Sequence, residues 1–205
     1  MFDLAALATA DRALAALDAR PKPAAGDSDV LVTTHDDLVS AGLSLDELRG
    51  ASPAPSDPEA PSADELRAMA FHTQFNSLSA LRTADGLGTM TEAGLPRVAG
   101  VEIMTLRRVL GQDVPGQDHF ARALLQIPDS FDEEAPCLVV APASGSRGVY
   151  GAVPLAAPWA LPKGCAIVYS DKAAGTDYFD FATQTGVELN GQRGALEETD
   201  PVFVP

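Results

Sequence analysis

Residues 137–151 read CLVVAPASGSRGVYG, in which five apolar residues are followed by a loop rich in glycine and serine. A short apolar run bounded by turn residues is typical of a buried strand in a parallel sheet. A second run of the same kind, CAIVY, occupies residues 165–169. Two such strands joined by a crossover segment predict a parallel pair, and therefore a domain of the α/β class.

The sequence before this unit predicts further strands. Residues 101–109 and 120–127 are rich in branched and large apolar side chains, and they flank a turn-like segment at 111–117. This pattern favours an antiparallel pair. In the crossover between the two parallel strands, helix signals are interrupted by Pro154, Pro158 and Pro162, so the sequence favours no regular helix there.

The N-terminal part has a different texture. Residues 4–19 carry leucines at helical spacing, and proline-containing linkers follow at 21–29 and 51–61. A second helix is expected to start at Ser62, where Ser62 and Glu65 form a capping-box pattern, and to end near Gly86. We therefore expect a mainly helical segment with Pro-rich linkers over 1–61 and an α/β domain over 62–205.

Composition narrows the classes of partner. The 205 residues are 46% apolar, as in a globular domain, and 14 basic against 29 acidic side chains give a net charge of −15. Nucleic acid and anionic membrane surfaces are disfavoured as partners, because both require clustered Lys and Arg. The sequence contains no run of about 18 apolar residues, so no membrane span is predicted. The N-terminus lacks the basic start of a secretion signal. A cytoplasmic location is expected.

Cysteine and histidine supply no metal or catalytic pattern. Cys137 and Cys165 lie in apolar runs without zinc-ligand spacing and are interpreted as buried, inert thiols. His35, His72 and His119 are scattered, and His72 is expected to serve in packing. We assign no metal site, no cofactor and no catalytic residue, because no histidine is tied by spacing to a nucleophilic serine.

The candidate binding site is the loop after the first parallel strand, where ligands bind in open α/β sheets. The loop contains Ser144, Gly145, Ser146, Arg147 and Gly148. Its glycines allow several backbone N–H groups to point at one oxyanion, although a tight strand exit would use glycine equally well. The loop matches neither a dinucleotide nor a Walker motif, and Ser146 does not fit the G-x-S-x-G pattern of a nucleophile.

The loop after the second strand is expected to face the same crevice. Asp171 stands at its start and is a candidate for contact with a substrate. A charged side chain after a strand is also a common surface feature, so both interpretations stay open.

Several stretches resemble the D-(−)-3-hydroxybutyrate oligomer hydrolase family. They are residues 136–152, 163–166, 169–172 and 175–176, with 36–43 and 63–67 upstream. The resemblance runs from about residue 30 to about 185, and the SGSRGVYGA block is its most specific part. It implies a serine esterase with an α/β-hydrolase-like sheet that cleaves short 3-hydroxybutyrate oligomers to monomers in polyhydroxybutyrate breakdown.

The resemblance also implies that the catalytic serine lies elsewhere. Family members are much longer, often begin with a secretion signal, and carry the nucleophile downstream of the SGSRG loop. We therefore expect an incomplete α/β-hydrolase-like sheet with an oxyanion-side loop, acting on a small ester substrate, with the C-terminal part of the hydrolase as a possible partner. Two alternatives are a non-catalytic remnant and a small α/β protein that binds a ligand or a partner.

Overall fold

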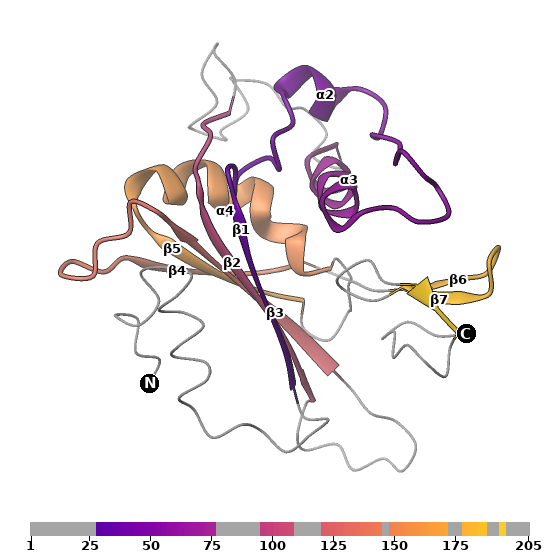
Figure 1. The fold of residues 1–205 in the computed structure, drawn as a ribbon. Helices are drawn as coiled ribbons and strands as arrows, with labels where there is room; N and C mark the ends of the chain where they lie inside the picture. Colours follow the sequence, from indigo (N-terminus) through magenta and orange to yellow (C-terminus); the bar gives the residue numbers. More distant parts are fainter. Residues whose placement is uncertain are drawn as a thin grey trace.

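The computed structural model describes residues 28–76, 95–108, 120–144, 148–171, 178–187 and 193–195. The helix expected over 4–19, the end of the helix expected near Gly86, and His119 lie outside these residues. The described part is built around a five-stranded mixed sheet with helices on one face (Figure 1).

The strands follow the order β1-β2-β3-β5-β4 across the sheet. The antiparallel pair is confirmed, since β2 (Gly100–Arg108) pairs with β3 (Phe120–Pro128). The parallel pair is also confirmed, because β4 (Leu138–Pro142) runs alongside β5 (Ala166–Ser170). β5 also pairs antiparallel with β3, so it joins the antiparallel and the parallel parts of the sheet.

Strand β1 (Ser28–His35) corrects the expectation of a mainly helical segment over 1–61. It pairs antiparallel with β2 along its whole length, as the first strand of the same sheet. The cause is visible in the sequence VLVTTH, because four of its six residues are β-branched and therefore favour an extended backbone. Among the described residues, strands from before and after residue 61 therefore belong to one sheet.

The helical layer covers one face of the sheet. It consists of α2 (Leu45–Arg49), α3 (Ala63–Asn76) and α4 (Val153–Ala160), which lie above the strands in Figure 1. Phe71 and Phe75 of α3 are fully buried against Leu124 and Tyr169 of the sheet. Each such aromatic side chain stabilises the fold by roughly 1.5–3 kcal/mol relative to exposure. Val101, Ile103 and other apolar residues form a second cluster on the opposite face.

The start of α3 confirms the capping box expected at Ser62. Ser62 Oγ accepts from the Glu65 backbone N–H at 3.3 Å, and the Ser62 N–H donates to the Glu65 carboxylate at 2.8 Å. The Ser56 N–H also donates to Glu65, at 2.7 Å, which fixes the preceding proline-rich segment to the helix. The backbone N–H groups of Ser56 and Ser62 lower the pKa of Glu65 to about 2.

The crossover contains a helix despite its prolines. The short turn η2 (Val149–Ala152) leads into α4, and η3 (Leu161–Lys163) leads out of it. Pro154 stands in the first turn of α4, where no backbone donor is required, so only Pro158 removes a helical hydrogen bond. Burial of Val153, Ala157 and their neighbours offsets that loss.

The two cysteines form a disulfide, so their interpretation as inert thiols is wrong. Cys137 and Cys165 each immediately precede a strand of the parallel pair, in which Leu138 lies opposite Ala166. The two Cα atoms are therefore neighbours, at 4.5 Å. Disulfides persist in oxidising compartments and are rare in the cytosol of most organisms, so this bond weighs against the expected cytoplasmic location.

A small three-stranded sheet completes the described residues. It contains β6 (Tyr178–Asp180), β7 (Thr185–Val187) and β8 (Arg193–Gly194). Arg193 and Asp180 form an ion pair at 2.8 Å across it. Within the described residues, no helix has both the length and the apolar character needed to cross a bilayer.

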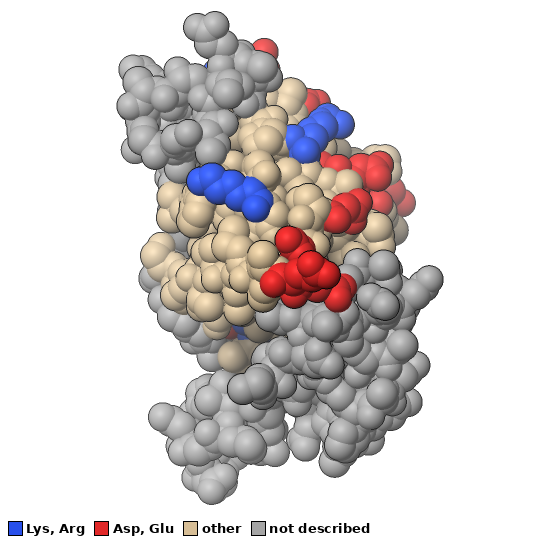
Figure 2. Space-filling view, turned by 90° about the vertical axis from the view of Figure 1, so that its left-hand side faces the viewer, with Lys and Arg blue, Asp and Glu red and all other residues tan. Residues whose placement is uncertain are grey.

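The charges on one side of the molecule are unevenly distributed. Figure 2 shows that Asp and Glu side chains gather over one part of this side, with one basic side chain next to them and another separated from them by uncharged surface. A charged ligand approaching this side would meet a mixed field, although the whole chain carries a net charge of −15.

Candidate functional site

The glycine- and serine-rich loop leaves the sheet at the end of β4. Ala143 is buried, and its N–H donates to the Ser170 carbonyl at 2.8 Å, while Ser144 is exposed. Gly148 ends the loop as the residue before η2, and its carbonyl accepts from the Gly151 N–H at 2.8 Å. Gly145, Ser146 and Arg147 lie outside the described residues.

Asp171 lies beside this loop but faces inward. Its side chain is 0% exposed, and its carboxylate accepts from the Arg122 backbone N–H at 2.9 Å. The Asp171 N–H donates in turn to the Arg122 carbonyl at 3.2 Å. These contacts make Asp171 a link between β5 and β3.

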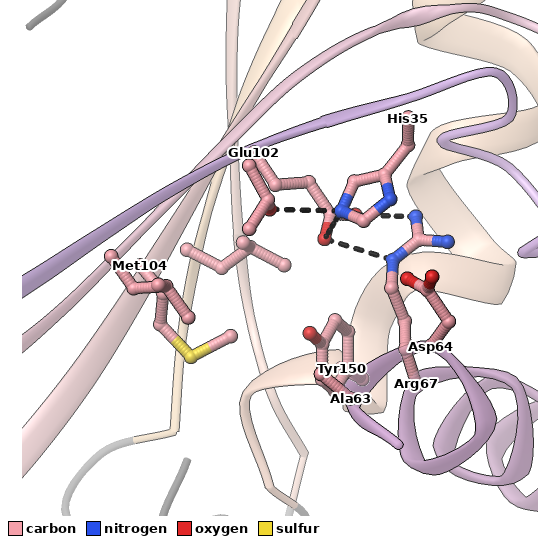
Figure 3. A pocket seen from close by; sticks show the side chains of 10 residues that line it. His35, Ala63, Asp64, Arg67, Glu102, Met104 and Tyr150 are labelled. Atoms are coloured by element: carbon pink, nitrogen blue, oxygen red, sulfur yellow. Dashed lines mark hydrogen bonds and ion pairs between the residues drawn. The ribbon is translucent and has the colours of Figure 1, made fainter. Parts of the chain in front are cut away.

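A pocket that the sequence analysis did not predict lies between α3 and the sheet (Figure 3). Its volume is about 60 Å³. Apolar side chains form part of the wall, and polar or charged side chains form the rest. The lining residues are Leu31, Thr33, His35, Ala63, Asp64, Arg67, Glu102, Met104, Leu124 and Tyr150. We call this the α3 pocket.

The strand register places the α3 pocket at the level of the glycine-rich loop. Met104 lies opposite Leu124, Leu124 lies opposite Tyr169, and Tyr169 lies opposite Ala141. Ala141 is the penultimate residue of β4, directly before the loop. Tyr150, which lines the pocket, follows the loop by two residues. Tyr150 is therefore the residue through which the segment after β4 contributes to the pocket.

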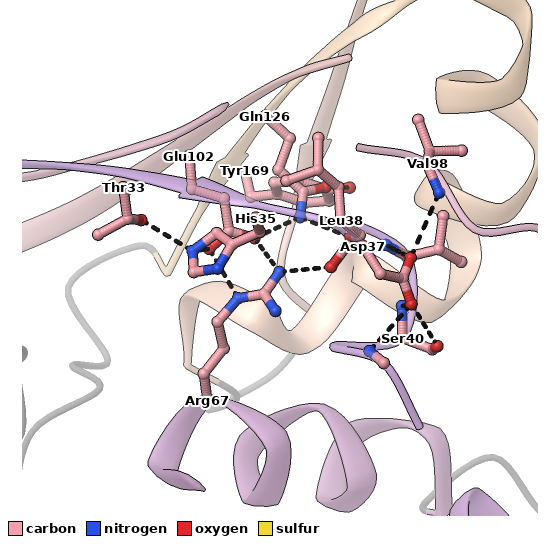
Figure 4. Close-up of polar contacts among 12 residues, drawn as sticks. Thr33, His35, Asp37, Leu38, Ser40, Arg67, Val98, Glu102, Gln126 and Tyr169 are labelled. Atoms are coloured by element: carbon pink, nitrogen blue, oxygen red, sulfur yellow. Dashed lines mark hydrogen bonds and ion pairs between the residues drawn. The ribbon is translucent and has the colours of Figure 1, made fainter. Parts of the chain in front are cut away.

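A buried ion pair forms the polar side of the pocket (Figure 4). Arg67 donates from Nη2 to Glu102 Oε1 at 2.7 Å and from Nε to Oε2 at 3.0 Å. Glu102 is 3% exposed. Burial alone would lower the pKa of Arg67, but the hydrogen bonds and charge of Glu102 outweigh it and raise that pKa above its ordinary value. Arg67 is therefore charged.

The ion pair continues as a hydrogen-bonded network across the sheet. Gln126 Nε2 donates to Glu102 Oε1 and to the Leu38 carbonyl, both at 2.8 Å. The Tyr169 hydroxyl donates to Gln126 Oε1 at 2.8 Å. Burial raises the pKa of Tyr169 well above its ordinary value, so this hydroxyl keeps its proton. The network links β2, β3 and β5 beneath α3.

The Asp37 side chain stabilises a turn within residues 36–43. The Asp37 carboxylate accepts from the backbone N–H groups of Val39 at 2.9 Å and Gly42 at 3.0 Å, and from Ser40 Oγ at 2.7 Å. The Asp37 carbonyl accepts from Arg67 Nη2 at 3.0 Å. This turn buries Leu38 beneath α3 and attaches the ion pair to the backbone. His72 is buried near Gly50, as expected of a packing residue.

His35 occupies the outer side of the ion pair. Its Nε2 lies 2.8 Å from Thr33 Oγ1 and 3.4 Å from Glu102 Oε2. Burial, reinforced by the positive charge of Arg67, lowers the pKa of His35 against the opposing effect of Glu102, Asp64 and Asp36. The imidazole is therefore neutral at pH 7.

His35 is expected to make stability depend on pH below neutrality. The unfolded chain takes up a proton near pH 6.5, while folded His35 takes it up only at lower pH. The free energy of unfolding should therefore fall as the pH falls through 6.5, and level off below the folded-state pKa. Urea unfolding of the whole chain between pH 8 and 5 measures this, and His35→Gln should flatten the dependence. Equal pH dependence in both chains would contradict it.

The sequence itself carries a signal for Glu102 and Gln126, two residues of this network. Glu102 stands between Val101 and Ile103 in an apolar strand, and Gln126 stands between Leu125 and Ile127. A polar side chain in such a run must be paired when it is buried, and its partner is often functional or structural. The partner Arg67 cannot be found this way, because it is 35 residues away from Glu102 in sequence. No cluster of potential metal ligands occurs among the described side chains.

The described residues combine a mixed five-stranded sheet with helices on one face and a pocket between α3 and that sheet. The sequence profile of the family described as 3HB-oligomer hydrolase (3HBOH) matches residues 5–199. This chain belongs to that family.

Curated relatives carry the name D-(−)-3-hydroxybutyrate oligomer hydrolase. The protein from Cupriavidus necator is 37% identical over 171 residues, which are 78% of this chain and 23% of the relative. The protein from Cupriavidus pinatubonensis is 36% identical over 169 residues, 77% of this chain and 23% of the relative. The protein from Burkholderia ambifaria is 33% identical over 171 residues, 77% of this chain and 24% of the relative.

The chain thus spans about a quarter of the length of the curated relatives it matches. The recognition of the family from the SGSRGVYGA block is confirmed. No solved structure matches the chain significantly.

Proposed function

We propose that this chain is the N-terminal part of an ester hydrolase that cleaves 3-hydroxybutyrate oligomers to monomers in polyhydroxybutyrate degradation. The observation that carries the proposal is the position of residues 144–148, between a parallel strand and the helix that follows it, in a member of this family. In α/β-hydrolases, the loop in this position supplies one backbone N–H of the oxyanion hole.

The proposed reaction is acyl transfer to a serine. The serine attacks the ester carbonyl, a histidine accepts its proton, and backbone N–H groups of residues 144–148 stabilise the oxyanion that forms. Each donor of this kind contributes about 3–4 kcal/mol to transition-state stabilisation. We assign the serine and the histidine to sequence outside these 205 residues, because relatives named as hydrolases are about four times longer.

The exposed face of β4 supports this assignment. β4 lies at the edge of the sheet, and Val140 is 69% and Leu138 48% exposed on the face opposite α4. Apolar side chains on an edge strand favour pairing or packing with another segment. We propose that the remaining part of the hydrolase completes an α/β-hydrolase sheet at this edge.

The test compares the chain alone with the chain continued by the remaining sequence of the Cupriavidus necator relative. Hydrolysis of a 3-hydroxybutyrate dimer is measured by release of the monomer. The chain alone is expected to show no activity above background, and the continued chain is expected to be active. Ser44→Ala, in the exposed cap of α2, should leave the activity of the continued chain unchanged.

Two outcomes would overturn the proposal. Activity of the chain alone that is lost in Ser146→Ala would make Ser146 the nucleophile. Absence of activity from the continued and correctly folded chain would exclude the reaction itself.

A further inference from the structure

The α3 pocket has one hydroxyl group that the fold does not use. Tyr150 packs its ring on Phe71, with ring centroids 5.1 Å apart, and this contact fixes its orientation. Figure 3 shows its hydroxyl pointing toward the interior of the pocket. Among the described residues, no group forms a hydrogen bond with that hydroxyl. Burial raises the pKa of Tyr150, so the hydroxyl remains a donor at every physiological pH.

The charges around the pocket discriminate between ligands. Among the described side chains of the lining, Glu102 pairs with Arg67 and His35 is uncharged, so the exposed Asp64 carboxylate is the remaining charge. A ligand carboxylate would be repelled by Asp64 and Glu102, at a cost that grows as water is excluded. A hydroxyl group can instead donate to the Asp64 carboxylate and accept from Tyr150.

Size and apolar lining define the rest of the ligand. The volume of about 60 Å³ holds about four water molecules or one short acyl group of similar size. Leu31, Met104 and Leu124 line the pocket on the sheet side. Such a surface favours a methyl-bearing carbon chain over a purely polar ligand.

We propose that the α3 pocket binds the uncharged hydroxyl end of a short 3-hydroxyacyl ester, with Tyr150 donating to the ligand hydroxyl and Asp64 accepting from it. The assignment to a substrate rests on the function proposed above, while the pocket chemistry stands on the contacts just described.

The first test measures binding to the 205-residue chain, without any need for catalysis. Methyl 3-hydroxybutyrate and methyl butyrate, which differ only in the hydroxyl group, are titrated against the chain by NMR. The hydroxy ester is expected to bind about three- to tenfold more tightly, the range for one neutral hydrogen bond. Tyr150→Phe should weaken binding of the hydroxy ester about three- to tenfold and leave binding of methyl butyrate unchanged.

Thr73→Val is the control, because it removes a hydroxyl from an exposed position on α3 that does not line the pocket. It should preserve the preference for the hydroxy ester. Equal binding of the two esters to the unmodified chain, or an unchanged preference in a folded Tyr150→Phe chain, would overturn the proposal. Should Tyr150→Phe fail to fold, Asp64→Asn at the helix surface provides the second variant, and an unchanged preference there has the same meaning.

The second test uses the continued hydrolase and separates the two proposals. A dimer with a free hydroxyl end is compared with a dimer in which that hydroxyl is replaced by hydrogen. Tyr150→Phe should raise KM about three- to tenfold for the first substrate, leave kcat unchanged, and have no effect on the second. Failure to hydrolyse either dimer overturns the proposed function, whereas equal KM changes for both overturn the hydroxyl site alone.

Discussion

Replacing Glu102 with alanine is expected to lower the free energy of unfolding by about 3–5 kcal/mol. The substitution leaves Arg67 buried and charged without the two hydrogen bonds that it makes with the carboxylate. It also removes an acceptor from Gln126, which is itself fully buried. Urea unfolding of the whole chain, followed by circular dichroism, measures the change.

The control for this prediction replaces both members of the ion pair. Glu102→Leu combined with Arg67→Met removes both charges and fills the space with apolar atoms, so it should be much less destabilising than Glu102→Ala. A matched surface control is Glu47→Ala, in the exposed cap of α2, which should change stability by about 1 kcal/mol or less. A loss below 1 kcal/mol for Glu102→Ala would contradict the assignment of a buried, fully charged pair.

The strands around the loop could be predicted from the sequence because their signals are local. The apolar runs at 137–141 and 165–169 lie within one residue of β4 and β5, and the pairing of 101–109 with 120–127 is the observed β2–β3 pair. The capping box at Ser62 is equally local, since its two side chains are three residues apart. Each of these features depends on neighbours along the chain.

The features that were missed depend on contacts between distant segments. β1 gains its place by pairing with β2, about 70 residues later in the sequence. α4 forms because burial against the sheet compensates for Pro158, which local propensity cannot reveal. The α3 pocket draws its lining from β1, β2, β3, α3 and η2, so no single stretch carries its pattern.

The location of the candidate site was only partly accessible to sequence reasoning. The order of strand, loop and helix in the sequence indicated where the chain leaves β4, and the parallel pairing places the ends of β4 and β5 next to each other. The inward orientation of Asp171 did not follow, because it depends on the register between β5 and β3. The parallel pairing of β4 with β5 likewise places Cys137 and Cys165 next to each other, although they are far apart in the sequence.

Removing the disulfide by replacing Cys137 and Cys165 with alanine is expected to lower the free energy of unfolding by about 3–4 kcal/mol. The bond closes a loop with a sequence separation of 28, and the estimate is the loop entropy that the unfolded chain regains. The parallel strands β4 and β5 should remain paired, because the bond lies before both strands and contributes none of their hydrogen bonds. Reducing agent should lower the free energy of unfolding of the unmodified chain by the same amount as the double substitution does, and it should leave the stability of the double variant unchanged. Two titratable thiols in the native, unreduced chain, or equal stability with and without reductant, would show that the bond does not form.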